Sequence, residues 1–143
     1  LLRAYVTDFP SDELIGAPGV LCIPHLGAST PESEDNCVDM ISRQLEDYLE
    51  TGSIVNSVNY PACPLTDAFR YRLTVMHANV PNTVGRITSA LAEQGVNIDN
   101  MVNKSRGEFA YTVLDLDDAL SEETIRRVEA LEPVYRARYF ARV

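Results

Sequence analysis

The sequence lacks a hydrophobic run long enough to span a bilayer, and it is poor in histidine and cysteine. Its 143 residues are 45% hydrophobic and 23% charged, which fits a soluble globular protein of one domain, or of one domain plus part of another. The three cysteines are widely spaced and form no metal-ligand pattern (Cys22, Cys37 and Cys63). We therefore expect reduced thiols in a cytoplasmic protein and, with only two histidines, no metal site. No membrane partner is expected either.

Basic residues are scarce in the first half of the chain. Residues 1–69 contain two of them, Arg3 and Arg43, against eleven acidic ones, whereas residues 70–143 contain ten of each. Neither part has the basic surplus of a nucleic-acid-binding protein. RNA recognition motifs share the order of elements expected for residues 70–143, but this charge balance removes the attraction to phosphate on which RNA binding relies.

Two short apolar runs near the N-terminus, at residues 4–7 and 19–23, predict strands, with turns and a short helical piece between them. Each run is continuous rather than alternating, which is typical of strands buried on both faces of a parallel sheet. Two such strands are not stable alone, and the chain lacks both a starting Met and a signal-peptide pattern. We therefore expect residues 1–52 to be the C-terminal fragment of a larger α/β domain.

Thr30-Pro31-Glu32 predicts the start of a helix, with a hydroxyl N-cap, proline at the first helical position and acids in the first turn. An apolar stripe at helical spacing follows (Cys37, Ile41, Leu45, Tyr48 and Leu49). Gly52 ends the pattern, so we expect a helix over residues 31–51 with its acidic face in water. Residues 53–69 are polar and turn-rich, and they are interpreted as a linker.

Residues 70–143 predict the order strand, helix, strand, strand, helix, strand. The strands are expected at 71–77, 96–104, 109–116 and 134–143, and the helices begin at Pro81 and after Ser121. This order is that of a ferredoxin-like α+β unit. Two helices cover only one face of a four-stranded sheet. The face that carries Phe109, Tyr111 and Val113, or the sheet edge, therefore has to meet a partner or tolerate exposure.

His25 directly follows the second apolar run. A histidine at the carboxyl end of a parallel strand lies where open α/β sheets bind ligands. Its imidazole can take a proton from a hydroxyl group while a hydride leaves the same carbon. From spacing alone, a histidine that merely fills the turn is the slightly better interpretation.

The segment from His25 to Glu32, His-Leu-Gly-Ala-Ser-Thr-Pro-Glu, resembles the active-site segment of D-isomer-specific 2-hydroxyacid dehydrogenases. The resemblance implies a Rossmann-type parent domain in which His25 is the general acid and base and Asp8 faces the nicotinamide of NAD. It also implies that an acid five positions after Asp8, Glu13, orients and charges His25. Asp12 is an alternative, because the loop before His25 is shorter than in many members, and an ordinary surface acid is an equally good interpretation of Glu13.

Two parts that this family needs are missing from the sequence. Its seven glycines form no G-x-G-x-x-G pattern, and the only basic residue before the predicted helix is Arg3. Without the loop that cradles the pyrophosphate, we do not expect this chain alone to bind NAD or to turn over a substrate.

A second group of polar residues belongs to the ferredoxin-like unit. His77 and Asn79 stand at a strand-to-helix turn and Asn97 begins the next strand, and together they offer donors and acceptors for the carboxylate and ammonium of an α-amino acid. The helix N-terminus near Pro81 adds a favourable field for the carboxylate. The alternatives are that Asn79 caps the helix and that Asn97 serves a turn.

His77-x-Asn79-x-Pro81, followed by residues 92–98, resembles the ACT domain of phosphoglycerate dehydrogenases that L-serine inhibits. The resemblance implies L-serine contacts at His77, Asn79 and Asn97, and homodimers that form through this domain. Asn82 stands where the family commonly has Gly, which puts the identity of the effector in doubt.

The two resemblances cover nearly all of residues 4–143. Their order implies the C-terminal part of an NAD-dependent phosphoglycerate dehydrogenase, which oxidises 3-phosphoglycerate to 3-phosphohydroxypyruvate in L-serine biosynthesis. Residues 70–143 would be its ACT regulatory domain. The alternative is a stand-alone amino-acid sensor without catalytic activity. This alternative does not explain residues 1–30, which are expected to be the end of a larger α/β domain.

Overall fold

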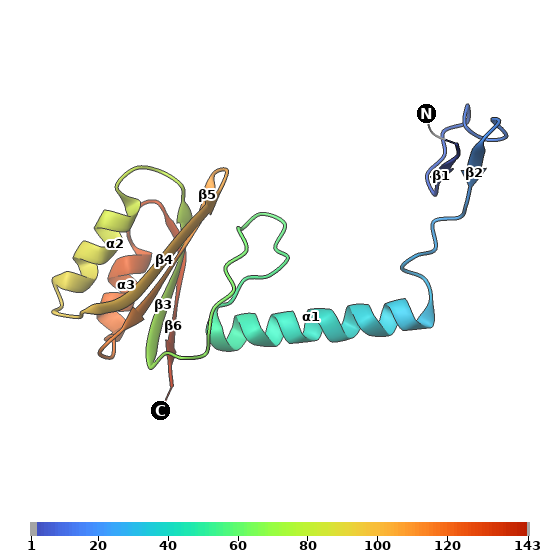
Figure 1. Ribbon diagram of the computed structural model, residues 1–143. Coiled ribbons are helices and arrows are strands. Elements are labelled where there is room, and N and C mark those ends of the chain that lie inside the picture. The colour runs from blue at the N-terminus through green and yellow to red at the C-terminus, as the bar shows by residue number, and fades with distance from the viewer. Residues whose placement is uncertain (1–2, 143) are drawn as a thin grey trace. The chain divides into compact units, whose positions relative to one another are not determined.

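A computed structural model describes residues 3–142 and contains six strands and three helices (Figure 1). In chain order they are β1 (Tyr5–Thr7), β2 (Val20–Cys22), α1 (Pro31–Thr51), β3 (Tyr71–Ala78), α2 (Thr83–Ala92), β4 (Ile98–Arg106), β5 (Phe109–Leu116), α3 (Glu122–Glu129) and β6 (Val134–Ala141). The chain divides into two compact units, one up to Ile41 and one from Ser42 onward. In the part of the chain that the structure describes, no helix is both long and apolar enough to cross a membrane.

The first unit contains a parallel pair of strands, as the sequence predicts. Tyr5 of β1 pairs with Val20 of β2, and the register continues to the carboxyl ends of both strands. None of the six side chains of this pair is fully buried, and Leu21 is 58% exposed, so its two faces lack the full cover that a parallel sheet normally has. The predicted short helical piece between the strands is wrong. Residues 11–19 form turns, because the few residues between Pro10 and Pro18 are too short to propagate a helix.

Helix α1 has the predicted bounds. The Thr30 hydroxyl oxygen accepts a hydrogen bond from the backbone N–H of Ser33 at 3.2 Å, and Gly52 follows the helix at a positive φ of 78°. These two caps satisfy backbone groups that the helix itself leaves unpaired. Its apolar stripe is not buried along most of its length, since Ile41 and Leu45 are 59% and 53% exposed.

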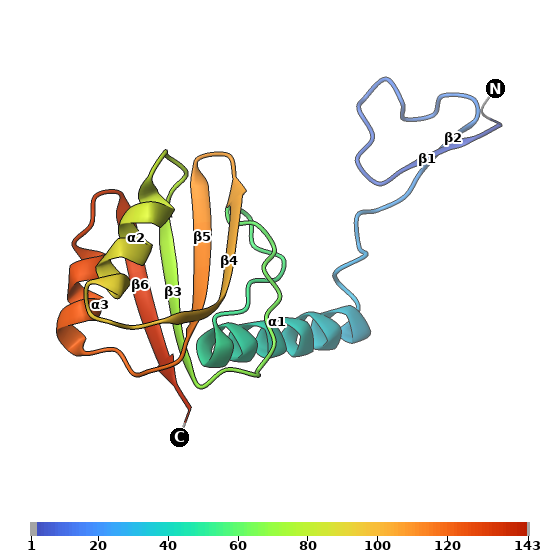
Figure 2. The same ribbon diagram turned by 60° about the vertical axis from the view of Figure 1, so that its left-hand side comes forward.

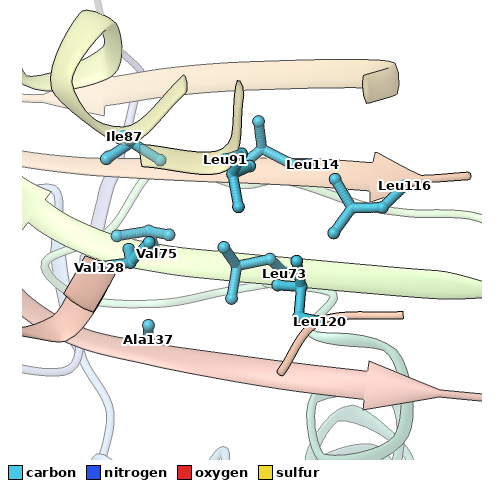
Figure 3. Close-up of a cluster of buried hydrophobic side chains, with 9 residues drawn as sticks. All are labelled: Leu73, Val75, Ile87, Leu91, Leu114, Leu116, Leu120, Val128 and Ala137. Atoms are coloured by element: carbon cyan, nitrogen blue, oxygen red, sulfur yellow. The ribbon is translucent and has the colours of Figure 1, made fainter. Parts of the chain in front are cut away.

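The second unit contains a four-stranded antiparallel sheet in the order β4-β5-β3-β6, with α2 and α3 on the same face (Figure 2). The order of strands and helices is the predicted one, so the ferredoxin-like prediction is confirmed. Apolar side chains of β3 and β5 point toward the helices and meet those of α2 and α3 in one core (Leu73, Val75, Ile87, Leu91, Leu114, Leu116, Leu120, Val128 and Ala137; Figure 3). Burial of this apolar surface is the main source of the unit's stability.

Two elements begin two residues later than predicted. Helix α2 begins at Thr83 rather than at Pro81, because Asn82 takes a left-handed conformation, with φ at 67°, that no right-handed helix includes. Strand β4 begins at Ile98 rather than at Val96, since Val96 still bonds back to Leu91 at the end of α2.

The opposite face of the sheet is covered by the chain's own residues 53–65, which we call the strap. Its Ile54 and Cys63 are buried and pair with each other through two backbone hydrogen bonds of 3.0 and 2.8 Å. They pack against Tyr111 and Val113 of β5. The sequence predicts this segment as a linker and this sheet face as exposed or bound to a partner. In the structure the strap covers this face of the sheet.

Polar side chains of the sheet hold the strap in place. The Tyr111 hydroxyl donates to the carbonyl of Gly52 at 2.7 Å. Two cations of β4 donate to strap carbonyls, Lys104 to Ala62 at 3.0 Å and Arg106 to Ser57 at 3.3 Å. Burial raises the pKa of Tyr111, so this phenol stays protonated and remains a donor.

Arg72 joins the strap, the end of α1 and the sheet. Its guanidinium is buried and donates to both carboxylate oxygens of Asp115, at 2.6 and 3.2 Å. It also donates to the carbonyls of Thr51 and Thr66, each at 3.1 Å. The ring of Phe69 lies 3.9 Å from its central carbon. This charge is therefore fully paired, as a buried charge needs to be.

We expect Arg72→Met to lower the free energy of unfolding by about 3 to 5 kcal/mol, because it leaves the Asp115 carboxylate without its partner. Urea denaturation followed by circular dichroism measures the change. Arg126→Met is the matched control, since Arg126 forms an exposed pair with Glu122 whose loss should cost less than about 1 kcal/mol. Equal losses in both variants would contradict the role given to Arg72.

Candidate functional site

The first candidate site lies at the carboxyl ends of β1 and β2. The backbone N–H of Ile23 donates to the carbonyl of Thr7 at 3.0 Å, which extends the pairing beyond the strands. Asp8 directly follows β1, His25 is the third residue after β2, and a carboxylate oxygen of Asp8 lies 2.6 Å from Nδ1 of His25. The His25 and Asp8 side chains are 56% and 48% exposed. Two residues that are distant in sequence are thus brought together at the edge where open α/β sheets bind ligands.

The His25 ring is held from a second side. Its centroid lies 4.3 Å from that of Phe9, and the backbone N–H of Phe9 donates to the Thr7 hydroxyl at 3.2 Å. Among the described residues, no hydrogen bond involves Nε2 of His25. An imidazole with one nitrogen on a carboxylate and the other open can accept or release a proton at the open nitrogen.

Glu13 does not reach His25 in the structure. Its carboxylate accepts a hydrogen bond from the Ser11 hydroxyl at 2.9 Å, within the turn that both residues share, and Asp12 is exposed. Of the acids singled out in the sequence, the structure brings only Asp8 to the imidazole. The catalytic and cofactor roles of these residues stay predictions.

The second candidate site lies in the ferredoxin-like unit, at one end of its sheet. His77 is buried on the helix-covered face, with Nδ1 2.8 Å from the carbonyl of Ala78 and Nε2 2.7 Å from the Thr112 hydroxyl. Thr112 in turn donates to the Asn103 side chain at 2.8 Å. Sequence reasoning missed Thr112 and Asn103. Strand alternation placed Thr112 on one face but did not reveal its bond to His77.

Asn79 holds the strand-to-helix turn to the β4–β5 hairpin. Its side-chain amide donates to the carbonyl of Gly107 at 3.0 Å, and its backbone N–H donates to that of Glu108 at 2.8 Å. Asn79 therefore does not cap α2. The N-cap position of that helix belongs to Asn82, whose side chain makes no capping bond.

Asn97 lies at the other end of the sheet. It precedes Ile98, which pairs with Leu116, and Leu116 pairs on its other side with Tyr71 at the start of β3. His77 is six residues further along β3, roughly 20 Å away at the rise of an extended strand. The three residues predicted to contact one amino acid therefore do not converge within a single chain.

The cysteines and acids form no alternative centre. Within the described range, no group of three or more His, Cys, Asp or Glu side chains is placed to hold a metal ion. Burial raises the pKa of the Cys63 thiol, which keeps it in the neutral form that does not bind metals or attack electrophiles. Cys63 therefore serves the packing of the strap.

Comparison with known proteins identifies the relatives of this chain. No family model matches the sequence. The D-3-phosphoglycerate dehydrogenase of Escherichia coli strain K12 is 31% identical over 121 residues, which are 83% of this chain and 30% of that protein. D-3-phosphoglycerate dehydrogenase 2 of Saccharomyces cerevisiae is 28% identical over 118 residues, 79% of this chain and 25% of its own length.

The chain is a relative of D-3-phosphoglycerate dehydrogenases, which confirms the resemblance that the sequence predicts. It spans less than a third of the length of these curated relatives, 30% and 25%.

Two solved structures are each similar to about half of the chain. The ACT domain from GTP pyrophosphokinase of Chlorobium tepidum covers 50% of this chain and 97% of its own, with a TM-score of 0.44 at 11% identity. A homoserine dehydrogenase from Thiobacillus denitrificans covers 50% of this chain and 16% of its own, with a TM-score of 0.43 at 28% identity. The ferredoxin-like assignment itself rests on the strand registers described above.

Asn82 should tolerate glycine but not a branched side chain. Its positive φ of 67° suits Gly and Asn, so Asn82→Gly should change the free energy of unfolding by less than about 0.5 kcal/mol, whereas Asn82→Val should cost about 1 to 2 kcal/mol. Urea denaturation measures both. Ser89→Val, at an exposed helical position of α2, is the control and should change stability by less than about 0.5 kcal/mol. An Asn82→Val variant with an unchanged free energy of unfolding would contradict the left-handed conformation of Asn82.

Proposed function

We propose that this chain is the C-terminal part of a cytoplasmic, NAD-dependent D-3-phosphoglycerate dehydrogenase, and that residues 70–143 are its ACT regulatory domain. The observation that carries the proposal is the match to the enzyme of that name over 83% of this chain. The pairing of His25 with an acid at the carboxyl end of a parallel strand pair supports it. The proposed substrate is 3-phosphoglycerate, and the product is 3-phosphohydroxypyruvate.

In the proposed reaction, His25 acts on the hydroxyl group of the substrate. Oxidation of a secondary alcohol removes a hydroxyl proton together with a hydride from the same carbon. Nε2 of His25, which makes no hydrogen bond among the described residues, takes the hydroxyl proton and returns it in the reverse reaction. Two acids are proposed to support this function, Asp8 at the same strand end and Glu13 in the turn between the two strands.

The residues present do not fit NAD itself. The dinucleotide needs a glycine-rich loop that leads from a strand into a helix N-terminus, and β1 and β2 are instead followed by Asp8-Phe9-Pro10 and by Pro24-His25. No step of binding or hydride transfer is therefore assigned to this chain. We propose that the cofactor is held by the part of the enzyme that corresponds to the rest of the relatives' length.

Replacing His25 with Ala in the full-length enzyme should lower kcat by about two to four orders of magnitude, because the hydroxyl proton loses its acceptor. Steady-state kinetics with 3-phosphoglycerate and NAD measure the loss. Asp35→Ala, at an exposed position of α1, is the control and should leave kcat unchanged. A loss of less than about tenfold in His25→Ala would reject the assignment.

We propose that the ACT domain binds L-serine between two copies of the chain. His77 and Asn79 lie at one end of the sheet and Asn97 at the other, so one ligand meets all three only if a second copy supplies Asn97. A contact of His77 with the ligand would replace one of its two hydrogen bonds described above.

Strand β4 is the surface that we propose for this pairing. It forms an edge of the sheet, and most of its side chains are exposed. In an antiparallel pairing of two β4 strands about a two-fold axis, the start of one strand lies beside the end of the other. Ser105 of β4 is level with His77, since both pair with Ala110. Asn97 of the second copy would then approach the end that carries His77 and Asn79.

Complementation between variants tests the shared site. Asn79→Ala and Asn97→Ala should each abolish the binding of L-serine, measured by isothermal titration calorimetry. Heterodimers of the two variants regain one intact site, so a randomly mixed population should recover about a quarter of the wild-type stoichiometry. Binding in either single variant would contradict the residue assignment, and a mixture without recovery would contradict a site between copies. Heat of binding with another amino acid but not with L-serine would identify that amino acid as the effector instead.

A further inference from the structure

We propose that Thr112 and Asn103 position His77 in the effector site, and that the hydrogen-bonded chain of these three side chains makes effector binding depend on a proton. Neither Thr112 nor Asn103 belongs to the sequence pattern on which the effector site was predicted. The inference rests on the proposed function, because it concerns the histidine that is proposed to contact the amino acid.

The chain of hydrogen bonds crosses three neighbouring strands of the sheet. His77 of β3 pairs with Ala110 of β5, and Thr112, two residues further along β5, pairs with Asn103 of β4. Nε2 of His77 lies 2.7 Å from the Thr112 hydroxyl oxygen, which lies 2.8 Å from Oδ1 of Asn103. His77 and Thr112 are buried, whereas Asn103 is exposed. The chain therefore leads from a buried imidazole to the edge strand β4.

An effector reaches this imidazole at the lowest cost through Nδ1. That nitrogen lies 2.8 Å from the carbonyl of Ala78, and the same carbonyl accepts from the backbone N–H of Val80 at 2.9 Å. The carbonyl thus keeps a partner when an effector oxygen takes its place at Nδ1. Loss of the bond at Nε2 would instead deprive the buried Thr112 hydroxyl of a partner, which costs free energy. We therefore assign Nδ1 to the effector and Nε2 to Thr112.

The orientation of Asn103 is tied to the charge of His77. A carbonyl oxygen only accepts hydrogen bonds, so Nδ1 carries a hydrogen. With Oδ1 of Asn103 toward Thr112, the hydroxyl gives its one hydrogen to Asn103 and accepts from Nε2, so the imidazole is protonated. With the amide turned over, its nitrogen donates to the hydroxyl, the hydroxyl donates to Nε2, and the imidazole is neutral.

The protein offers no counter-ion to a protonated His77. The charged residues of the helices and turns around it are Arg86 of α2, Glu129 of α3, and Glu108 and Glu132 of the adjoining turns. Among the described residues, none of them forms an ion pair with His77. Arg86 donates to the carbonyl of Glu132, and Glu129 accepts from a backbone N–H of β6. The two cations of β4 donate to the strap on the opposite face.

A carboxylate bound at Nδ1 supplies this missing counter-charge. It pairs best with the protonated imidazole, so binding favours the protonated arrangement and takes up a proton wherever the neutral arrangement is populated. A ligand that prefers the protonated form binds more weakly as that form is lost. The affinity of the site for an amino acid should therefore fall as the pH rises.

Isothermal titration calorimetry of the full-length enzyme with L-serine tests the dependence on the proton. The dissociation constant should rise about tenfold between about pH 6 and about pH 8.5. The difference between the heats in phosphate and in Tris buffer at one pH measures the proton uptake, which should be greater than zero. His77→Gln is the matched control. Its amide donates without titrating, so it should bind more weakly and without this dependence on pH.

Substitutions in the chain test the positioning role. Thr112→Val keeps the shape but removes the hydroxyl, so it should weaken binding about tenfold, whereas Thr112→Ser should stay within about threefold of the wild type. Thr88→Val, which removes a partly exposed hydroxyl of α2, is the control and should leave the affinity unchanged. Asn103→Asp should retain binding with a smaller dependence on pH, because a carboxylate only accepts and so holds the protonated arrangement.

The outcomes separate this inference from the function on which it rests. An enzyme that binds neither L-serine nor another amino acid contradicts the proposed effector site itself. Binding that is lost in His77→Ala but is independent of pH in the wild type overturns only the role of the proton. Equal affinities of Thr112→Val and Thr112→Ser overturn the positioning role, because the hydroxyl would then not be the group that holds the imidazole.

Discussion

The second unit depends on one buried positive charge. The Arg72 guanidinium contacts β5 through Asp115, the end of α1 through the carbonyl of Thr51, and the chain beyond the strap through that of Thr66. A buried charge is stable only when its N–H donors are hydrogen-bonded. Each of these segments therefore has to keep its acceptor within hydrogen-bond distance of the guanidinium. The sheet, the strap and the end of the helix are thereby fixed in a common arrangement, which apolar packing alone would specify less uniquely.

Most of the ferredoxin-like unit could be predicted from the sequence, because its signals are local. The alternation along β5, the Ser121 cap of α3 and the glycine turn at Gly107 each depend on neighbouring residues, and the structure has all three. The strap could not be predicted. Its polar, proline-containing residues suggest a linker, and only the tertiary contacts of Ile54 and Cys63 with the far side of the sheet reveal its packing.

The candidate sites were predicted in part. His25 and Asn79 were predicted because their segments match known patterns, but a sequence motif does not show which of its residues contact each other. The bond between Asp8 and His25 depends on the parallel register of two strands. The distance between His77 and Asn97 depends on the order of strands in the sheet. Both are properties of topology, which the spacing of residues along the chain does not determine.

The strap also limits how the second unit can assemble. With helices on one face of the sheet and the strap on the other, only the outer strands β4 and β6 offer backbone groups for extending it. Strand β6 and the residue after it carry Arg136, Arg138 and Arg142, and two of these already donate to carbonyls of their own chain. Two such rows of like charge repel each other. Two copies that join their sheets through β4 therefore form one combined sheet in which both outer strands are β6. This arrangement favours a closed dimer over an open-ended fibre.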